Sequence, residues 1–91
     1  MTYKEKLIYL IEHYNTGDYT TWDFCSEWHL CRRDDGEGEE LSEFSEQYMR
    51  KLDHLCDYYS PFPEDFELYP YFVHEEEIKE YVKDFRRDFI Y

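Results

Sequence analysis

Lysine and arginine are scarce in this 91-residue sequence, which contains ten of them against 23 aspartates and glutamates. The formal net charge at pH 7 is therefore −13. Nucleic acids and anionic membrane surfaces carry the same sign of charge and repel such a chain. We expect no direct binding to nucleic acid or to a membrane, and we expect a cationic partner instead.

Long apolar runs are also missing, and the apolar stretches present are too short to cross a bilayer. The three cysteines, Cys25, Cys31 and Cys56, are odd in number and form no CxxC pair. No charged and then apolar leader precedes them, so we expect reduced thiols in a cytoplasmic protein. A chain of this length is expected to form one helical domain over residues 1–91.

Motifs of catalysis and cofactor binding are not found. The sequence has no phosphate-binding glycine loop, no HExxH and no GxSxG. His29 with Cys25 and Cys31 offers zinc-ligating residue types, but Cys25 falls on an apolar stripe, which favours core packing. The run DDGEGEE does not match an EF-hand loop. We predict that the protein is not an enzyme and needs neither cofactor nor metal.

Apolar residues recur at helical spacing in four segments, which predicts helices over residues 3–15, 21–33, 43–59 and 75–89. Thr20 or Thr21 and Ser42 are suitable caps for the second and third helices. Residues 34–40 are predicted to form a mobile acidic loop. Residues 60–74 contain prolines and many apolar groups, which predicts a long connection packed against the body. The predicted fold is all-α, a small four-helix bundle.

The net charge is confined to one part of the chain. Residues 34–77 contain fifteen acids and two bases, whereas the flanks are balanced. Carboxylates held by a helix end and a proline-stiffened loop pair with cations at low entropic cost, and tyrosine is a favoured interface anchor. The predicted partner-binding residues are Asp53, Asp57, Tyr58, Tyr59, Glu64, Asp65 and Glu67. A secondary set on the acidic loop is Asp34, Asp35, Glu37, Glu39 and Glu40.

Three segments carry a resemblance to a known family. They are KLIYLIEHYNTGDYTTWDFCSEW, LDHLCDYYSPFPED and EEEIKEYVKDFRRDF, which together span most of the chain. In order and pattern they resemble the colicin D immunity family and related immunity proteins of contact-dependent growth inhibition systems. The resemblance implies a four-helix bundle that binds a toxin domain, often a tRNA-cleaving ribonuclease. It also implies acidic groups that cover the active site where substrate phosphates would stand.

Carried over by position, the acidic site at the end of the third helix falls on Asp57, and the proline turn falls on Pro61. Ser60 and Phe62 occupy positions that are acidic in the family, and Glu64 and Asp65 are candidates to replace those charges. The sequence thus predicts an immunity protein that neutralises a basic nuclease toxin. One alternative is an acidic nucleic-acid mimic that inhibits a restriction or CRISPR nuclease. Another is a metal-binding or enzymatic helical domain whose carboxylates ligate an ion.

Overall fold

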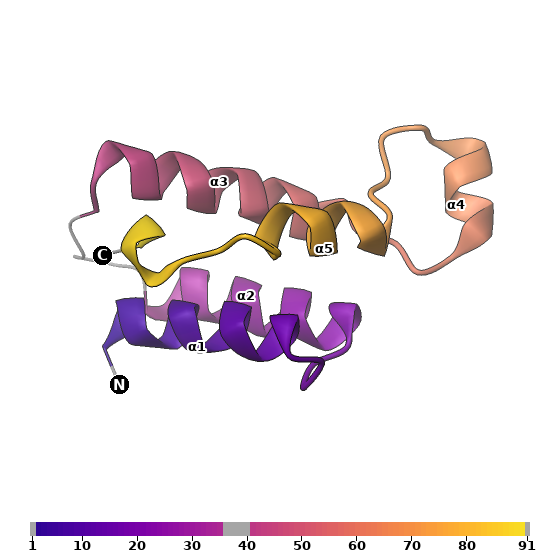
Figure 1. The fold of residues 1–91 in the computed structure, drawn as a ribbon. Helices are drawn as coiled ribbons and strands as arrows, with labels where there is room; N and C mark the ends of the chain where they lie inside the picture. The colour runs from indigo at the N-terminus through magenta and orange to yellow at the C-terminus, as the bar shows by residue number, and fades with distance from the viewer. Residues whose placement is uncertain (1, 36–40, 91) are drawn as a thin grey trace.

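The computed structural model describes residues 2–35 and 41–90, and for residues 34 and 35 it describes only the backbone. Within these ranges the protein is mostly helical and contains no β-strand, so the predicted all-α class is confirmed at this level. The elements, drawn in Figure 1, are α1 (Tyr3–Asn15), α2 (Thr21–Asp35), α3 (Glu43–Asp57), α4 (Pro63–Leu68), α5 (Glu75–Val82) and the 3-10 turn η1 (Arg87–Phe89).

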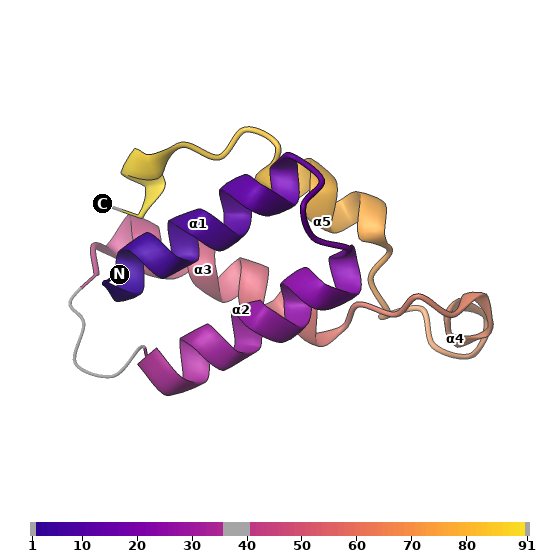
Figure 2. The same cartoon turned by 90° about the horizontal axis from the view of Figure 1, so that it is seen from below.

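The first two helices form an antiparallel hairpin with capped ends (Figure 2). The Thr2 hydroxyl accepts a hydrogen bond from the Glu5 amide at 3.2 Å, and the Thr20 hydroxyl accepts one from the Asp23 amide at 3.1 Å. Between the helices, Gly17 has a φ of +89°, a conformation that glycine adopts at little steric cost. These starts and the end of α1 agree with the prediction from the sequence.

The second helix is longer than predicted. It continues to Asp35, so Asp34 and Asp35 belong to α2 and not to the predicted acidic loop. No glycine or proline occurs between Thr21 and Asp35, which explains why the helix persists past the arginine pair. The rest of that loop, residues 36–40, lies outside the described residues.

One core forms where α1, α2, α3, α5 and the C-terminal turn meet. Tyr14 of α1 stacks on Phe24 of α2, with 4.4 Å between ring centroids. All three cysteines are buried, so the prediction that Cys25 packs in the core is confirmed. The most deeply buried apolar side chains are Leu7, Ile11, Phe24, Trp28, Met49, Leu52, Ile78, Val82 and Ile90.

The last helix is shorter than predicted. α5 ends at Val82, although the apolar repeat continues to Phe89. The side-chain amide of Asn15 donates to the Val82 carbonyl at 2.8 Å, so the end of α1 satisfies the end of α5. The chain then turns back, and η1 places Phe89 against Tyr48 with 5.3 Å between ring centroids. The repeat therefore reflects packing on α3 and not a continuous helix.

Residues 60–74, which we call the arm, lie beyond the ends of α3 and α5 and carry α4 at their tip (Figures 1 and 2). No residue of α4 is buried. The prediction that this connection packs against the body is wrong for most of its apolar side chains, because many of its rings contact one another instead. The large exposed ones are Phe62, Leu68, Tyr69 and Tyr71.

One polar atom in the core has no partner. Among the buried side chains that the structure describes, only the Tyr48 hydroxyl lacks a hydrogen bond. Its ring stacks on Tyr81, whose own hydroxyl donates to the Tyr48 carbonyl at 2.9 Å. The two neighbouring tyrosines thus offer a matched comparison of an unsatisfied and a satisfied hydroxyl.

We predict that Tyr48→Phe leaves the free energy of unfolding unchanged or raises it by up to about 1 kcal/mol, because it removes a buried group without a partner. Tyr81→Phe removes a hydrogen bond and should lower it by about 1 kcal/mol. Urea denaturation of both variants followed by circular dichroism measures the difference. A loss of stability in Tyr48→Phe as large as that in Tyr81→Phe would contradict this assignment.

Candidate partner-binding surface

The arm and the helix ends that support it carry charge of one sign. Between Lys51 and Lys79 the sequence contains eight acids and no lysine or arginine. Three of these acids, Glu75, Glu76 and Glu77, occupy the first turn of α5, where the helix dipole favours negative charge. This part of the molecule therefore presents a negative potential, which Lys79 at its boundary offsets in part by pairing with Glu75 at 3.1 Å.

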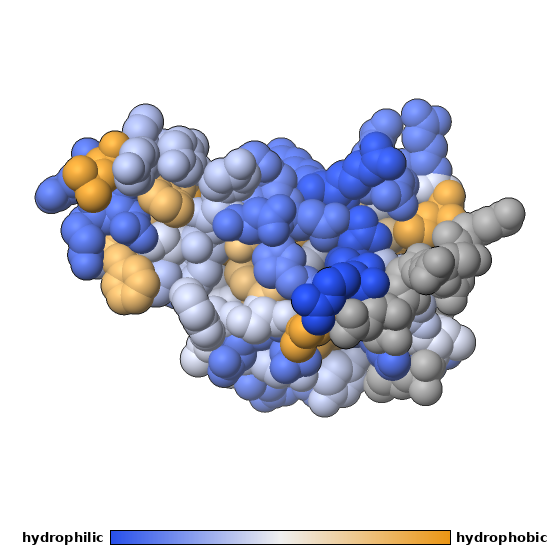
Figure 3. Space-filling view, turned by 180° about the vertical axis from the view of Figure 1, so that it is seen from behind, coloured by the Kyte–Doolittle hydropathy of each residue, from blue (hydrophilic) through white to orange (hydrophobic). Residues whose placement is uncertain are grey.

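Large apolar side chains share the arm with the acids. Phe62 is 53% exposed and Leu68 is 69% exposed, while Glu64 and Glu67 of α4 are exposed beside them. Figure 3, a view from behind, shows apolar groups next to hydrophilic ones on the projecting lobe. We call this set the arm surface, and it consists of Tyr58, Phe62, Glu64, Glu67, Leu68, Tyr69 and Tyr71.

The rings of the arm surface hold one another in place. Tyr71 lies 5.5 Å from Tyr58 and 5.4 Å from Tyr69, measured between ring centroids, and it also contacts Phe72. Phe72 in turn contacts Phe66 edge-on at 6.4 Å. Aromatic contacts of this kind fix the rings at low entropic cost, so the surface is organised before a partner arrives.

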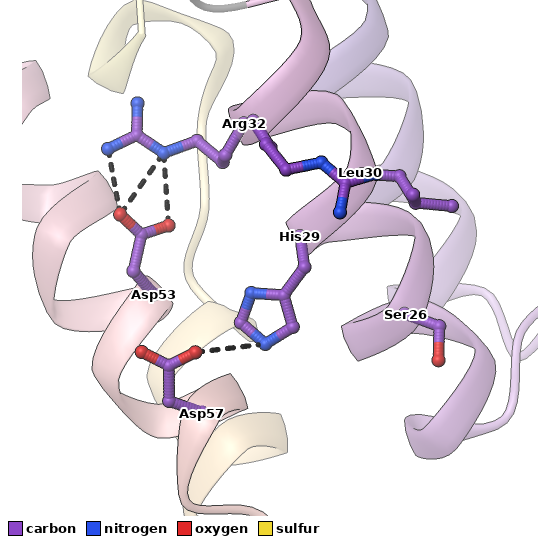
Figure 4. Close-up of a pocket in the computed structure, with 7 residues that line it drawn as sticks. Ser26, His29, Leu30, Arg32, Asp53 and Asp57 are labelled. Carbon is purple, nitrogen blue, oxygen red and sulfur yellow. Dashed lines mark hydrogen bonds and ion pairs between the residues drawn. The ribbon is translucent and has the colours of Figure 1, made fainter.

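Asp53, the first predicted contact residue, is engaged within the protein. Its carboxylate accepts hydrogen bonds from the Arg32 guanidinium at 2.8 and 3.0 Å (Figure 4). It also accepts one from the Trp28 indole at 2.7 Å. The side chains of Arg32 and Asp53 are only 18% and 28% exposed. Arg32 also donates to the Tyr3 hydroxyl at 2.7 Å. We therefore infer that Asp53 has a structural role, in which it links α3 to α2 directly and to α1 through Arg32.

The Arg32 guanidinium is charged in this setting. Burial alone lowers its pKa, but the hydrogen bonds to Asp53 and Tyr3 more than offset that effect, and the net pKa is raised. A permanently charged guanidinium at this depth depends on the Asp53 carboxylate for its stability.

Asp57, one helical turn after Asp53, has a looser contact. Its carboxylate lies 3.2 Å from Nε2 of His29, and the side chains are 60% and 40% exposed. Both line an open groove between α2 and α3 with a volume of about 710 Å³. Figure 4 shows the Ser26 hydroxyl pointing away from the imidazole, so these residues do not form a nucleophile and base pair. Asp57 remains accessible to a partner.

The remaining predicted residues lie at the base of the arm or on it. Tyr59 is partly buried against the core and pairs with Val73 in an isolated bridge. Asp65 accepts a short hydrogen bond from the hydroxyl of the buried Ser60. Glu64 and Glu67 are exposed, and their side-chain carboxylates form no hydrogen bond or ion pair with another described residue. Of the predicted acids, Asp57, Glu64 and Glu67 are thus the most available.

Ser60 fixes the direction in which the arm leaves the body. Its hydroxyl donates to Asp65 and accepts from the Phe62 amide at 3.1 Å. Two backbone hydrogen bonds close the base, from the Ser60 amide to Val73 at 3.2 Å and from the Val73 amide to Tyr58 at 2.7 Å.

We predict that Ser60→Ala loosens the arm without unfolding the body. Loss of this hydroxyl removes two hydrogen bonds of about 1 kcal/mol each, which should speed amide hydrogen exchange in residues 62–66 roughly 30-fold. The global free energy of unfolding should fall by less than about 1 kcal/mol. Exchange measured by mass spectrometry tests this, with the exposed Ser26→Ala as control. A global loss with unchanged exchange in the arm would refute it.

The secondary set is only partly covered by the structure. The backbones of Asp34 and Asp35 end α2, whereas their side chains and Glu37, Glu39 and Glu40 lie outside the described residues. Sequence reasoning did not assign Phe62, Leu68, Tyr69 or Tyr71 to the surface. The available signal was their position between Pro61 and Pro70 or, for Tyr71, directly after Pro70, because these prolines limit how the segment can fold back.

The described residues contain few groups suited to metal binding and few segments suited to a membrane. Over residues 2–35 and 41–90, no three histidine, cysteine or acidic side chains gather closely enough to hold a metal ion. In the same ranges no helix is both long and apolar enough to span a membrane. No family model, curated protein or solved structure matches the chain. The chemistry of the arm surface is therefore the main indication of function.

Proposed function

We propose that the protein is an immunity protein, a non-enzymatic inhibitor that binds a basic nuclease toxin domain, such as a tRNase, in the cytoplasm of the producing cell. One observation carries the proposal. The arm surface combines exposed aromatic side chains with carboxylates, and neither lysine nor arginine occurs in the surrounding sequence. Exposed apolar groups of this extent, placed on a projection, are typical of a protein interface.

The sign of the charge favours a nuclease among possible partners. A nuclease binds phosphates with lysine and arginine, and an active site of that kind attracts carboxylates arranged on a rigid surface. Glu64 and Glu67 lie on α4, and Asp57 lies at the end of α3, so helices fix all three backbones. Opposite potentials on the two proteins would make association fast and sensitive to salt.

A second copy of the chain is a poor occupant of the arm surface. The net charge of −13 is concentrated in the part of the sequence that includes the arm, and like charges across an interface oppose association. A cationic partner both covers the exposed rings and neutralises the carboxylates. The resemblance to the colicin D immunity family points to the same kind of partner.

Co-expression tests the proposal. The proposal expects a toxin domain to be encoded immediately upstream of this gene. That domain is produced from an inducible promoter with and without the protein, and colony survival is counted. We expect survival only when both are present, and purified protein should stop RNA cleavage at an equimolar ratio. Survival without any effect on purified nuclease would contradict inhibition by direct binding.

The alternative, a nucleic-acid mimic directed at a restriction or CRISPR nuclease, is separated by the same purified components. An immunity protein inhibits its own toxin and leaves those nucleases active. Inhibition of a restriction or CRISPR nuclease, with no effect on the toxin domain, would favour the mimic.

A further inference from the structure

A small pocket lies at the base of the arm, apart from the groove between α2 and α3. Its volume is about 220 Å³, below the roughly 300–1,000 Å³ of pockets that hold drug-sized ligands. A space of this size suits a single side chain. It is lined by Tyr59, Ser60, Pro61, Pro63, Phe66, His74, Glu75 and Glu76.

The walls of this pocket are flat and fixed. The Phe66 ring is stacked on the His74 ring with 3.7 Å between centroids and 6° between planes. The buried Ser60 hydroxyl is held by Asp65, and the Tyr59 backbone is paired with Val73. Planar groups favour a planar occupant, because a guanidinium stacks on rings whereas an ammonium does not.

The charge of the pocket is negative. Glu75 accepts hydrogen bonds from Thr21 at 3.3 Å and from Lys79 at 3.1 Å, and Glu76 makes none with any described residue. Burial raises the pKa of the Tyr59 hydroxyl, and the charges of Glu75 and, more weakly, Glu76 raise it further. Both glutamates line the pocket together with Tyr59. Among the described residues that line the pocket there is no lysine or arginine.

The dipole at the N-terminus of α5 does not reverse the negative charge of the pocket. A helix N-terminus carries about half a positive charge, which by itself opposes a bound cation. Glu75, Glu76 and Glu77 in the first turn bring three carboxylates, of which only Glu75 is paired with a lysine. The net field at the pocket therefore still favours a cation.

We propose that this pocket receives an arginine side chain of the partner protein, with the guanidinium between the Phe66 and Tyr59 walls and paired to Glu76. The identity of the arginine's source rests on the proposed function, whereas the pocket itself can be tested without the toxin. A carboxylate and a guanidinium form two parallel hydrogen bonds, which gives arginine an advantage over lysine at such a site.

Nuclear magnetic resonance on the full ¹⁵N-labelled chain tests the pocket with N-acetyl-arginine methylamide as the probe. We expect saturable shifts of backbone amides in residues 59–66 and 74–76. N-acetyl-citrulline methylamide, which has nearly the same shape and no charge, should cause none. Glu76→Gln should weaken binding of the arginine probe about threefold, as expected for one exposed ion pair.

Glu80→Gln is the matched control, because it removes the same charge from α5 one turn away from the pocket. Its binding constant should equal that of the unaltered protein. Equal shifts with both probes, shifts spread over all acidic segments, or equal effects of the two substitutions would overturn the assignment. Toxin protection with no arginine binding would refute only the pocket, and arginine binding without protection would refute only the proposed function.

Discussion

Replacing Asp53 with alanine is expected to lower the free energy of unfolding by about 2–3 kcal/mol, because it leaves a largely buried guanidinium without its carboxylate. The Trp28 indole also loses its acceptor at 2.7 Å. This cost exceeds that of an ordinary surface ion pair, since Arg32 is only 18% exposed. Urea denaturation measures the change.

Asp57→Ala supplies the control for this prediction. It lies one helical turn further along α3 and contacts His29 in a pair that is largely exposed. Its effect should stay within about 0.5 kcal/mol, as for other exposed pairs. A change below 1 kcal/mol in Asp53→Ala, or equal changes in both variants, would show that the contact with Arg32 does not join the helices.

If the protein neutralises a nuclease toxin as proposed, reversing the charge of Glu64 and Glu67 together should abolish that neutralisation. In the double variant Glu64→Lys with Glu67→Lys, two ammonium groups face the cations of the toxin. Like charges across an interface cost several kcal/mol, so we expect affinity to fall roughly 100-fold or more. Calorimetry with the purified toxin domain at two salt concentrations measures the loss, and colony survival reports its consequence.

The control is Glu27→Lys with Asp84→Lys, which changes the net charge equally on exposed positions of the helical body. Both double variants should keep the helical circular dichroism spectrum of the unaltered protein. The control should lose some association rate and retain protection. Loss of protection in both double variants would mean that the total charge, and not the arm surface, determines binding.

Helix starts were predictable because they depend on local chemistry. Ser42 accepts a hydrogen bond from the Ser45 amide at 3.1 Å, as its position before an apolar repeat predicts. Pro63 was harder to interpret, because a proline both ends one helix and favours the first position of the next. It occupies that first position in α4, with Glu64 and Asp65 in the first turn.

The site was less predictable than the helices. The pairing of Asp53 with Arg32 joins residues 21 positions apart, and no local pattern distinguishes it from the exposed Asp57. The position of the aromatic side chains of the arm was wrongly predicted for a related reason. Composition shows that rings will be packed, but it does not show whether they pack on the core or on one another.

The closed base of the arm separates two tasks in the chain. Tyr59 and Val73 tie the two ends together, and the residues of α4 contribute nothing to the buried core. Substitutions at the tip therefore cost little folding energy, and the segment can diversify quickly when a partner changes. Under the proposed function, replacing residues 62–71 is accordingly the direct way to change the choice of partner while keeping the same helical body.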